Sequence, residues 1–528
     1  MLHQELLNNV KPYTDTISRA VTLVVATGNH SKRAELVSFL QQIADLSDAI
    51  HLVERDTSYL RSPLSFALEI DGNDTGMHFS GIPSGHEFNS FILALLYAGG
   101  RELKLDAKVQ SLIKEVKTPI HFEIFVSLSC HNCPDIVQAL QQFALLNPNI
   151  SAEMIDGGLF PQLVEERELQ GVPAVFANGE AFANGKTEIS QLLDKLQNIA
   201  PEARVSGNTV ASTLQDVVVI GGGPAGASAA IYSARKGLAV TLLAERLGGQ
   251  VKDTQGIENL ISVSHTTGSQ LSGNLVEHMS SYPITVRENI RVESISGDQV
   301  RTITLNTGEQ IQTRSIILAT GAQWRKLGIP GEEENIGTGV AYCPHCDGPF
   351  FTGKDVVVVG GGNSGIEAAL DLAGIVKSVT VVEFMPTLKA DKVLVDQAQQ
   401  RANISIITHA ACQEIVAENG KVIALEYLDR ANNKRVRLDT DGVFVQIGLS
   451  PNSQLVADLV ERTVHGEIIV DNKCRTTQAN VFAAGDVTTV PYKQIVIAMG
   501  EGAKAALSAF EYLLANPVHR TDIEKQAA

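Results

Sequence analysis

Asp216-Val-Val-Val-Ile220-Gly221-Gly222-Gly223-Pro224-Ala225-Gly226 is an apolar run followed by a glycine-rich turn, and it is the strongest structural signal in this chain. Its apolar run predicts a buried parallel strand, and its glycines allow a tight turn, close approach of the backbone to a pyrophosphate, and packing of the next helix. The following apolar run ends at Glu245, at the distance where an acid binds ribose hydroxyls. The stretch therefore predicts a Rossmann-like domain that binds a dinucleotide.

The same pattern occurs a second time, at Asp355-Val-Val-Val-Val359 followed by Gly360-Gly361-Gly362-Asn363-Ser364-Gly365. Here the acid at the end of the next apolar run is Glu383. A carboxylate at this position binds the adenosine ribose diol and repels a 2′-phosphate, and the next basic residue along the chain is Lys389. The second site is therefore predicted to prefer NADH to NADPH.

Two Cys-x-x-Cys pairs, Cys130-His131-Asn132-Cys133 and Cys343-Pro344-His345-Cys346, contain four of the six cysteines. A dithiol at this spacing closes a small ring and passes two electrons on by thiol–disulfide exchange. A zinc half-site is the main alternative, but it needs a second pair nearby, and these pairs lie about two hundred residues apart. The two pairs predict an electron relay, with no metal site.

The other cysteines, Cys412 and Cys474, lie in strand-like or turn surroundings without partners and are predicted to be packing residues. The histidines inside the pairs, His131 and His345, are either acid–base groups or spacers that tune the thiol potential, and we favour the second interpretation. Trp324, the only tryptophan, is predicted to pack in a core or an interface.

The first two hundred residues contain a duplication, because Val37-Ser-Phe-Leu-Gln-Gln-Ile-Ala44 resembles Val137-Gln-Ala-Leu-Gln-Gln-Phe-Ala144. Each copy has a β-rich run before this segment, at residues 21–26 and 121–126, and a Gly-apolar-Pro turn after it. Strand, loop, helix and turn in this order are typical of a thioredoxin-like α/β fold. The sequence therefore predicts two tandem thioredoxin-like folds.

Only the second copy carries thiols. Cys130 is predicted to precede a helix whose N-terminal amides stabilise a thiolate, with Cys133 about one turn inside that helix. The first copy has His30 and Arg33 at the equivalent positions, so it is predicted to be a redox-silent scaffold. In a thioredoxin-like fold the Val172-Pro173 bond would be cis and lie against the dithiol, a trans turn proline being the alternative.

Length and composition limit the classes of function. At 528 residues the chain exceeds one hydrophobic core, so several domains are expected. A formal net charge of −17 argues against a general nucleic-acid or membrane-surface role. The N-terminal residues lack the pattern of a secretory signal, so a cytoplasmic location is expected, where paired cysteines are catalytic or metal-binding more often than structural.

A small, polar stretch from Ala200 to Thr213 predicts a flexible linker. The predicted domains are a thioredoxin-like fold without thiols (1–100), a thioredoxin-like fold with Cys-x-x-Cys (101–199), the linker (200–213), an FAD-binding domain in two parts (214–330 and 449–528), and an NADH-binding domain with Cys-x-x-Cys (331–448). The fold class is α/β, with two tandem thioredoxin-like folds followed by FAD- and NAD-binding Rossmann-like domains of the thioredoxin reductase type.

The motifs resemble a known family. GGGPAG at 221–226, CPHCDG at 343–348, GGGNSG at 360–365 and AAGDV at 483–487 resemble the low-molecular-weight thioredoxin reductases over about residues 215–513. With SCHNCPD at 129–135 and the double thioredoxin-like N-terminus, the whole chain resembles the flavoprotein family of the alkyl hydroperoxide reductases. The resemblance implies FAD at the first dinucleotide site and NADH at the second, with the FAD domain split around the NADH domain. It also implies a homodimer that reduces a peroxiredoxin partner, which in turn reduces hydrogen peroxide and organic hydroperoxides.

Carried over residue by residue, the resemblance implies that Cys346 faces the flavin, Cys343 is the interchange thiol, and Asp347 handles protons at that dithiol. Glu87 resembles an acid near the N-terminal thiols. The implied catalytic residues are Cys130, Cys133, Cys343, Cys346 and Asp347. The implied FAD-binding residues are Gly221, Gly223, Gly226, Glu245, Gly249, Gln250, Asn259, Thr320, Gly321, Gly485, Asp486, Gln494 and Ile495, with Glu258 beside them. The implied NADH-binding residues are Gly360, Gly362, Gly365 and Glu383.

The expected relay runs from NADH to FAD, to Cys343–Cys346, to Cys130–Cys133 and to the peroxiredoxin, each exchange passing through a mixed disulfide. Because one inserted domain carries both a dithiol and the nicotinamide site, we expect it to swing about its two connections, near residues 330 and 448. A reductase of a thioredoxin- or glutaredoxin-type disulfide and a non-enzymatic redox sensor are the alternatives.

Overall fold

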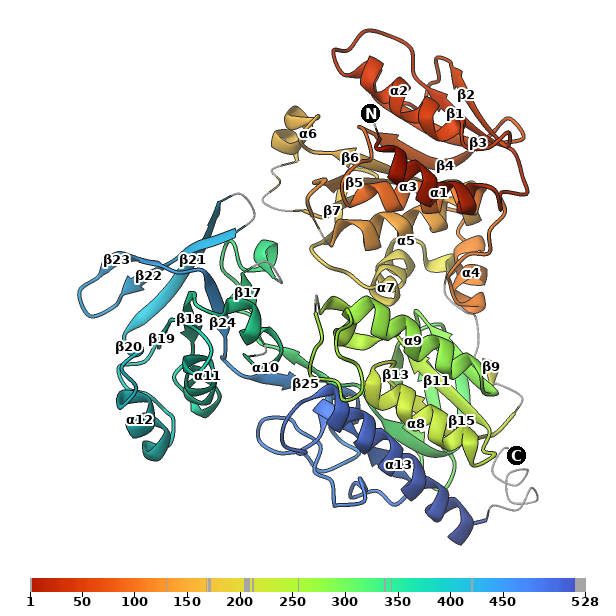
Figure 1. Cartoon of the computed structure of the whole chain (residues 1–528). Helices are drawn as coiled ribbons and strands as arrows, with labels where there is room; N and C mark the ends of the chain where they lie inside the picture. Colours follow the sequence, from red (N-terminus) through yellow and green to blue (C-terminus); the bar gives the residue numbers. More distant parts are fainter. Residues whose placement is uncertain are drawn as a thin grey trace. The chain divides into compact units, whose positions relative to one another are not determined.

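The computed structural model describes residues 2–130, 132–167, 169, 172–203, 209–210, 213–254, 256–336, 339–342, 344–418 and 421–517 (Figure 1). The chain divides into two compact units. Residues 1–210 form the first unit with the short segments 287–291 and 304–310, and the remainder forms the second. The predictions for His131 and Cys343 lie outside the described residues, as do those for the side chains of His345 and Cys346.

One eight-stranded sheet runs through the first unit, in the order β2-β1-β3-β4-β6-β5-β7-β8 (Figure 1). Its strands are β1 (Val21–Val25), β2 (Ile50–Glu54), β3 (Ser65–Ile70), β4 (Asn73–Ser80), β5 (Ile120–Val126), β6 (Ile150–Asp156), β7 (Ala174–Ala177) and β8 (Glu180–Asn184). The helices are α1 (Gln4–Thr14), α2 (Arg33–Ala44), α3 (Glu87–Ala98), α4 (Ala107–Lys114), α5 (Cys133–Leu146), α6 (Pro161–Glu166) and α7 (Ile189–Ile199), followed by the 3₁₀ turn η1 (Pro201–Ala203).

Strand pairing in the two halves of this sheet is the same. β1 pairs parallel with β2 and antiparallel with β3, which pairs antiparallel with β4. β5 pairs in the same way with β6 and β7, and β7 with β8. The tandem of thioredoxin-like folds is therefore confirmed. The two copies share one sheet, because β4 of the first pairs parallel with β6 of the second. This pairing leaves neither strand as an exposed sheet edge. No sequence pattern indicated it.

Ion pairs also join the copies. Arg61 of the first copy binds Glu123 at 2.6 Å and Glu153 at 2.7 Å, both on strands of the second copy. Burial alone raises the pKa of Glu153, but hydrogen bonds from His121 and Arg61 outweigh it and hold the pKa at about 2. Because both carboxylates are buried and paired, loss of the arginine would leave unpaired buried charge.

An aromatic core fixes α3 on the sheet. Phe66 and Phe79 stack at 4.9 Å between ring centres on β3 and β4, and Phe91 of α3 meets both rings edge-on. All three side chains are fully buried. Such ring pairs add specific geometry to the area that they bury, so the start of α3 has a fixed position over the sheet.

In the second unit, the first glycine-rich stretch forms β10 (Gln215–Ile220) and α8 (Pro224–Arg235), as predicted. The sheet order is β12-β11-β10-β15-β14-β13, with β26 and β9 also paired to β15. These strands are β9 (Thr209–Val210), β11 (Val240–Ala244), β12 (Ile284–Glu288), β13 (Val292–Gly297), β14 (Arg301–Leu305), β15 (Glu309–Leu318) and β26 (Val481–Ala483). Because β26 lies parallel to β15, the chain returns to this sheet after a long insertion.

Two helices complete this Rossmann-like layer, α9 (Gly268–Ser280) and α13 (Ile495–Ala515), and α13 packs closely on α8. The contact needs a glycine, because a Cβ on Gly502 would lie 2.1 Å from the carbonyl oxygen of Ala225. The part of the chain that follows the insertion is therefore bound tightly to the part that precedes it.

The insertion forms a second parallel sheet in the order β17-β24-β18-β19-β20 and an antiparallel sheet β21-β22-β23. The strands are β17 (Val340–Ala341), β18 (Asp355–Val359), β19 (Ser378–Val382), β20 (Ile404–Ile407), β21 (Ala410–Glu418), β22 (Lys421–Asp429), β23 (Lys434–Asp439) and β24 (Gly442–Val445). The helices are α10 (Pro344–Asp347), α11 (Asn363–Ala373) and α12 (Lys392–Gln399), with η4 (Gly348–Phe351) after α10.

A two-stranded antiparallel ribbon, β16 (Ala322–Trp324) with β25 (Leu449–Pro451), carries the chain into and out of this insertion. The outgoing strand agrees with the predicted connection near residue 448, whereas the incoming strand lies earlier than the predicted residue 330. Apolar runs predict strands of a core but give no signal for so short a ribbon. The domain swing itself stays a prediction.

The flexible linker predicted for residues 200–213 contains two ordered pieces, and its residues 204–208 and 211–212 lie outside the described residues. Within residues 200–213 the structure has η1 (Pro201–Ala203) and the short strand β9, whose Thr209 and Val210 pair with Glu309 and Gln310. An extended segment can pair with the edge of a sheet through its backbone alone, whatever side chains it carries. The composition of the segment therefore does not predict such a strand. Among the helices of the described residues, none has the length and apolar content that crossing a membrane requires.

Candidate dithiol and dinucleotide sites

The N-terminal dithiol lies where β5 ends and α5 begins. Cys133 is the first residue of α5 and is fully buried, whereas Cys130 precedes the helix and is only partly buried. The prediction that Cys133 lies one turn inside the helix was wrong, since α5 begins at Cys133. Cys130 is therefore the sulfur that a partner protein can reach.

The environment of Cys133 favours the neutral thiol. A hydrogen bond with Cys130 and burial both raise the pKa of Cys133 far above that of an ordinary thiol. The negative charges of Cys130 and Glu87 act in the same direction. Cys133 is thus a group that needs a base before it can attack a mixed disulfide on Cys130.

The Val172-Pro173 peptide bond lies against the dithiol. It is cis, as predicted. The carbonyl oxygen of Val172 lies 3.8 Å from Cys130 Sγ, which donates to it. Two segments that are distant in the sequence therefore meet at the sulfur, in the arrangement expected of a thioredoxin-like fold.

A buried carboxyl group, Glu87, completes this site. It is fully buried at the first residue of α3, and neither of its carboxyl oxygens has a hydrogen-bond partner among the described residues. Burial raises the pKa of Glu87 to about 7, and the charges of Cys130 and Asp135 add to the rise. A group that titrates near neutral pH beside a dithiol is suited to general acid–base work.

Close backbone packing brings Glu87 to the dithiol. The amide of His86 donates to the carbonyl oxygen of Leu128 at 3.0 Å, two residues before Cys130. A Cβ on Gly85 would lie 2.3 Å from that same oxygen, and Gly85 has φ +56°. The glycine lets the first copy approach the cysteine loop of the second. The expectation from the family resemblance that Glu87 lies near the N-terminal thiols is therefore confirmed, and the first copy contributes this carboxyl group besides acting as a scaffold.

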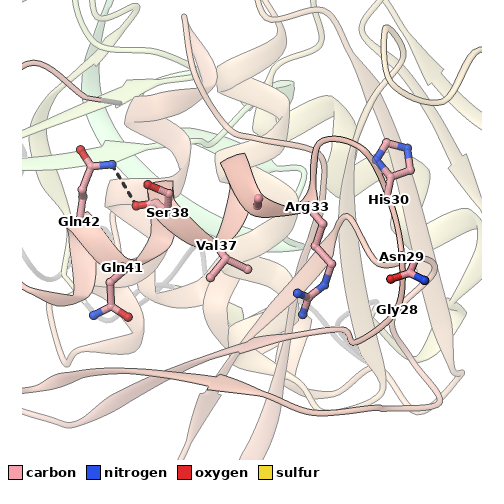
Figure 2. A pocket seen from close by; sticks show the side chains of 9 residues that line it. Gly28, Asn29, His30, Arg33, Val37, Ser38, Gln41 and Gln42 are labelled. Atoms are coloured by element: carbon pink, nitrogen blue, oxygen red, sulfur yellow. Dashed lines mark hydrogen bonds between the residues drawn. The ribbon is translucent and has the colours of Figure 1, made fainter.

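The equivalent loop of the first copy has no thiol chemistry. Figure 2 shows His30 and Arg33 lining a pocket of about 590 Å³ that extends along α2 to Gln42. Arg33 donates to the carbonyl oxygen of Ala26 at 2.9 Å and to Glu54 at 2.6 Å, and His30 Nδ1 accepts from the amide of Lys32 at 3.1 Å. Both side chains serve the local structure, as expected of a redox-silent copy.

The glycine turn after β10 fits a dinucleotide. A Cβ on Gly221 would lie 2.1 Å from the carbonyl oxygen of Ala319, and one on Gly226 would lie 1.9 Å from that of Gly221, so internal packing requires both glycines. At Gly223 the nearest atom to a Cβ is Gly249 Cα at 4.0 Å. This position leaves room above the N-terminus of α8, where the amides would bind a pyrophosphate.

Distant FAD-binding candidates meet in the structure. Asn259 Nδ2 donates to Gln494 Oε1 at 3.1 Å, although the two lie far apart in the sequence. Thr320 and Gly321 follow β15 and are bound by Asn452, whose Nδ2 donates to Thr320 O at 2.8 Å and whose amide donates to Gly321 O at 3.0 Å. Sequence reasoning missed Asn452, because no motif contains it.

Other FAD-binding candidates lie at element ends, as a ligand site requires. Glu245 follows β11 directly. Gly249 and Gln250 begin the 3₁₀ turn η2 (Gly249–Asp253), and Gly485 and Asp486 begin η6 (Gly485–Val487). Burial raises the pKa of Asp486, partly offset by Lys493. Ile495 is the first residue of α13.

The glycine turn after β18 repeats this construction. A Cβ on Gly360 would lie 2.3 Å from Gln446 O, and one on Gly365 would lie 1.9 Å from Gly360 O, whereas one on Gly362 meets no described atom within 4 Å. Glu383 follows β19, and its carboxylate accepts the amides of Gly361 at 2.5 Å and Met385 at 2.7 Å. Each carboxylate oxygen keeps a second lone pair, which a ribose hydroxyl can use.

Replacing Gly362 with alanine is expected to raise the KM for NADH about tenfold, because the new methyl group displaces the coenzyme and not the protein. FAD content should not change. Steady-state NADH oxidation and the flavin absorbance of the purified variant measure both quantities. Gly374→Ala, at the other end of α11, is the matched control, since its Cβ would make an ordinary contact at 3.5 Å. An unchanged KM in the Gly362 variant contradicts the assignment.

The segment before the second dithiol is firmly held. The hydroxyl group of Tyr342 donates to Glu332 at 2.9 Å, and Gln446 Nε2 donates to the Tyr342 carbonyl oxygen at 2.7 Å. Burial and this hydrogen bond raise the pKa of Tyr342. Trp324 of the ribbon stacks on the Tyr342 ring at 6.2 Å, so the tryptophan packs, as predicted. Asp347 is the last residue of α10.

The two remaining cysteines differ from one another. Cys412 lies in β21, and burial raises the pKa of its thiol to about 12. Cys474 is fully buried in the core, and its thiol donates a hydrogen bond to Glu501 Oε2 at 2.8 Å. The sequence did not indicate this partner. Burial, followed by this hydrogen bond, raises the pKa of Cys474 strongly. Neither thiol ionises readily at neutral pH, in agreement with packing roles.

Comparison with known proteins covers both parts of the chain. Residues 215–502 match the pyridine nucleotide-disulphide oxidoreductase family, and residues 120–197 match a thioredoxin domain. The chain is 46% identical to the F subunit of alkyl hydroperoxide reductase from Staphylococcus aureus over 517 residues, which are 98% of this chain and 100% of that protein. It is 45% identical to the protein of the same name from Escherichia coli over 518 residues, 97% of this chain and 99% of that one.

Solved structures resemble the C-terminal part of the chain. The thioredoxin reductase from Streptococcus pyogenes has a TM-score of 0.55 and 33% identity, and covers 58% of this chain and 100% of its own. The thioredoxin reductase from Giardia duodenalis has the same TM-score with 30% identity, and covers 57% of this chain and 100% of its own.

Proposed function

Because this chain belongs to the F-subunit family of the alkyl hydroperoxide reductases, within the pyridine nucleotide-disulphide oxidoreductases, we propose that it uses NADH to reduce the disulfide of a peroxiredoxin partner. It is a flavoprotein disulfide reductase whose coenzymes are FAD and NADH. The observation that carries the proposal is the buried Glu87 carboxyl beside Cys130 and Cys133, in the same chain as two dinucleotide-binding turns.

The residues have distinct roles in this proposal. Bound FAD would supply the redox chemistry, as the acceptor of a hydride from NADH and the donor of two electrons to a disulfide. The turn from Gly221 to Gly226 and the acid Glu245 hold one dinucleotide, and the turn from Gly360 to Gly365 and Glu383 hold the other. Cys343 and Cys346 form the first dithiol, with Asp347 as its proton carrier, and the support for these roles is the family resemblance.

The last exchange takes place at Cys130. Its thiolate attacks the partner disulfide, which forms a mixed disulfide and releases one partner thiolate. Glu87 then accepts the proton of Cys133, whose raised pKa makes this base necessary. The Cys133 thiolate attacks Cys130 Sγ, closes the Cys130–Cys133 disulfide and releases the second partner thiolate. The partner gains two electrons, and the N-terminal dithiol loses two.

We further propose a cytoplasmic homodimer in which the inserted domain swings about the β16–β25 ribbon. The family resemblance supports the dimer. The ribbon supports the swing, because β16 and β25 pair over only three residues each, and so short a pairing is suited to act as a hinge.

The test of the proposed function is peroxide-dependent oxidation of NADH. It should appear only when a peroxiredoxin is added with the protein. Equal or faster oxidation with thioredoxin or glutaredoxin disulfides in place of the peroxiredoxin would support the alternative acceptor. Absence of turnover with every disulfide, including a small aromatic one, would favour a redox sensor.

A further inference from the structure

The structure brings a basic side chain to the NADH site that no sequence pattern indicated. Arg430 follows β22, far along the chain from Glu383. Its guanidinium carbon lies 3.9 Å from the centre of the Phe384 ring, and its Nη1 donates to the carbonyl oxygen of Phe384 at 2.9 Å. Arg430 therefore lies against the residue that directly follows the ribose-binding acid.

Backbone hydrogen bonds fix this arrangement. The amide of Arg430 donates to His409 O at 2.8 Å, and the amide of His409 donates to Met385 O at 3.1 Å. The amide of Ala410 donates to Glu383 O at 2.9 Å. The ends of β19, β20 and β22 are thus tied together, and the position of Arg430 relative to Glu383 does not depend on a flexible side chain alone.

The place of Arg430 corresponds to the adenine end of the coenzyme. β18, β19 and β20 are parallel neighbours, so their carboxyl ends meet at one edge, where ligands bind. The turn after β18 takes the pyrophosphate and Glu383 after β19 takes the ribose. The adenine must then continue away from the pyrophosphate, past the end of β19 toward β20. Phe384 and Arg430 lie there, and both side chains are exposed.

We propose that Arg430 binds the coenzyme, with its guanidinium held over the Phe384 ring and its other face stacked on the adenine of NADH. The inference rests on the proposed assignment of NADH to this site. A guanidinium is planar and weakly hydrated, and it stacks well on aromatic faces. Because Phe384 and its carbonyl group already hold the guanidinium, little side-chain freedom is lost on binding.

Recognition of a 2′-phosphate is a different role that an arginine could have here. The Glu383 carboxylate, fixed beside the ribose position by two amides, repels such a phosphate. The adenine ring carries no charge and is not repelled. The geometry therefore favours adenine stacking over phosphate binding.

Fragments of the coenzyme test the proposal in the full-length, FAD-loaded protein. Arg430→Ala is expected to weaken binding of ADP-ribose about tenfold by calorimetry and to raise the KM for NADH by the same factor. Reduced nicotinamide mononucleotide, which lacks the adenosine, should keep its wild-type kcat/KM. Arg430→Lys keeps the positive charge but lacks the planar guanidinium group, so it should resemble the alanine variant. Arg437→Ala, an exposed arginine on β23 that pairs with Asp439, is the control and should change none of these values.

Each other outcome overturns the proposal. Unchanged affinity for ADP-ribose in Arg430→Ala means that the side chain does not touch the adenosine. An equal loss with reduced nicotinamide mononucleotide means that Arg430 supports the fold. A loss confined to NADPH means that it binds a 2′-phosphate. Failure of the proposed function is distinguishable, because a wild-type protein that binds ADP-ribose and oxidises NADH without reducing a peroxiredoxin leaves this inference intact.

Discussion

Replacing Cys130 with serine is expected to lower the reduction of the peroxiredoxin by about a thousandfold or more. Cys130 is the accessible sulfur of the N-terminal pair, and a serine hydroxyl is neither ionised nor nucleophilic enough at neutral pH to replace it. NADH oxidation with a small artificial electron acceptor should continue at the wild-type rate, because the dinucleotide sites belong to the other unit. The two assays on one preparation measure both rates.

Cys412→Ser is the matched control for this variant. Cys412 is also partly buried, but its thiol has a pKa of about 12 and lies in β21. The control should keep peroxiredoxin reduction. Substantial peroxiredoxin reduction by the Cys130 variant would show that electrons leave the protein from the second dithiol and do not pass through the first.

An electron count checks the same relay without a partner. Anaerobic titration with NADH should deliver about six electrons to each wild-type chain, two for the flavin and two for each disulfide. The Cys130 variant should take up about four. About four electrons in the wild-type protein would mean that one cysteine pair is outside the relay.

Replacing Glu87 with glutamine is expected to slow peroxiredoxin reduction about a hundredfold above pH 7, which is the usual share of a general base. The wild-type rate should rise with pH through the pKa of about 7, because only the carboxylate accepts the proton of Cys133. The variant should lose this rise. The pH profile of single-turnover reduction, started from the fully reduced protein, measures the effect.

The same substitution should stabilise the fold. The pKa of Glu87 is higher in the folded protein, about 7, than its ordinary value of 4.5, so the folded state binds more protons between these values. Stability from this group is therefore lost as pH rises from about 4.5 to about 7, by up to about 3 kcal/mol. Glu87→Gln removes this loss. Hydrogen exchange of α3 amides should be slower than in the wild type at pH 8 and similar at pH 4.5.

Glu35→Gln is the control for both measurements, since Glu35 also lies in the first turn of a helix but is exposed. The Glu35 variant should show the wild-type rate of peroxiredoxin reduction and the wild-type hydrogen exchange of the α3 amides. A Glu87 variant with the wild-type pH profile would show that another group accepts the proton of Cys133.

Local patterns in the sequence were enough to predict most of the fold. The turns at Gly221–Gly226 and Gly360–Gly365 were recognisable, because the backbone can approach so closely only where side chains are absent. The glycines that this approach requires lie within six consecutive residues, so they form a motif in the sequence. The Cys130–Cys133 spacing and the repeated segments at residues 37–44 and 137–144 are local signals of the same kind. The start of α5 was misplaced, because helix ends depend on one or two dihedral angles that composition hardly constrains.

The family resemblance had placed Glu87 near the N-terminal thiols, but the folded chain was needed to show its burial there and to show where Arg430 lies. The shared sheet places Glu87 of one copy beside Cys130 of the other, and strand ends tied by backbone hydrogen bonds place Arg430 on Phe384. Neither pair of residues is separated by a spacing that forms a recognisable motif, because each contact depends on how whole helices and strands pack. Local sequence patterns were therefore enough to identify the two glycine turns, the Cys130–Cys133 pair and the thioredoxin-like duplication. Packing decided which carboxyl group titrates at the dithiol and which arginine lies at the adenine position, since burial and proximity are properties of the folded chain.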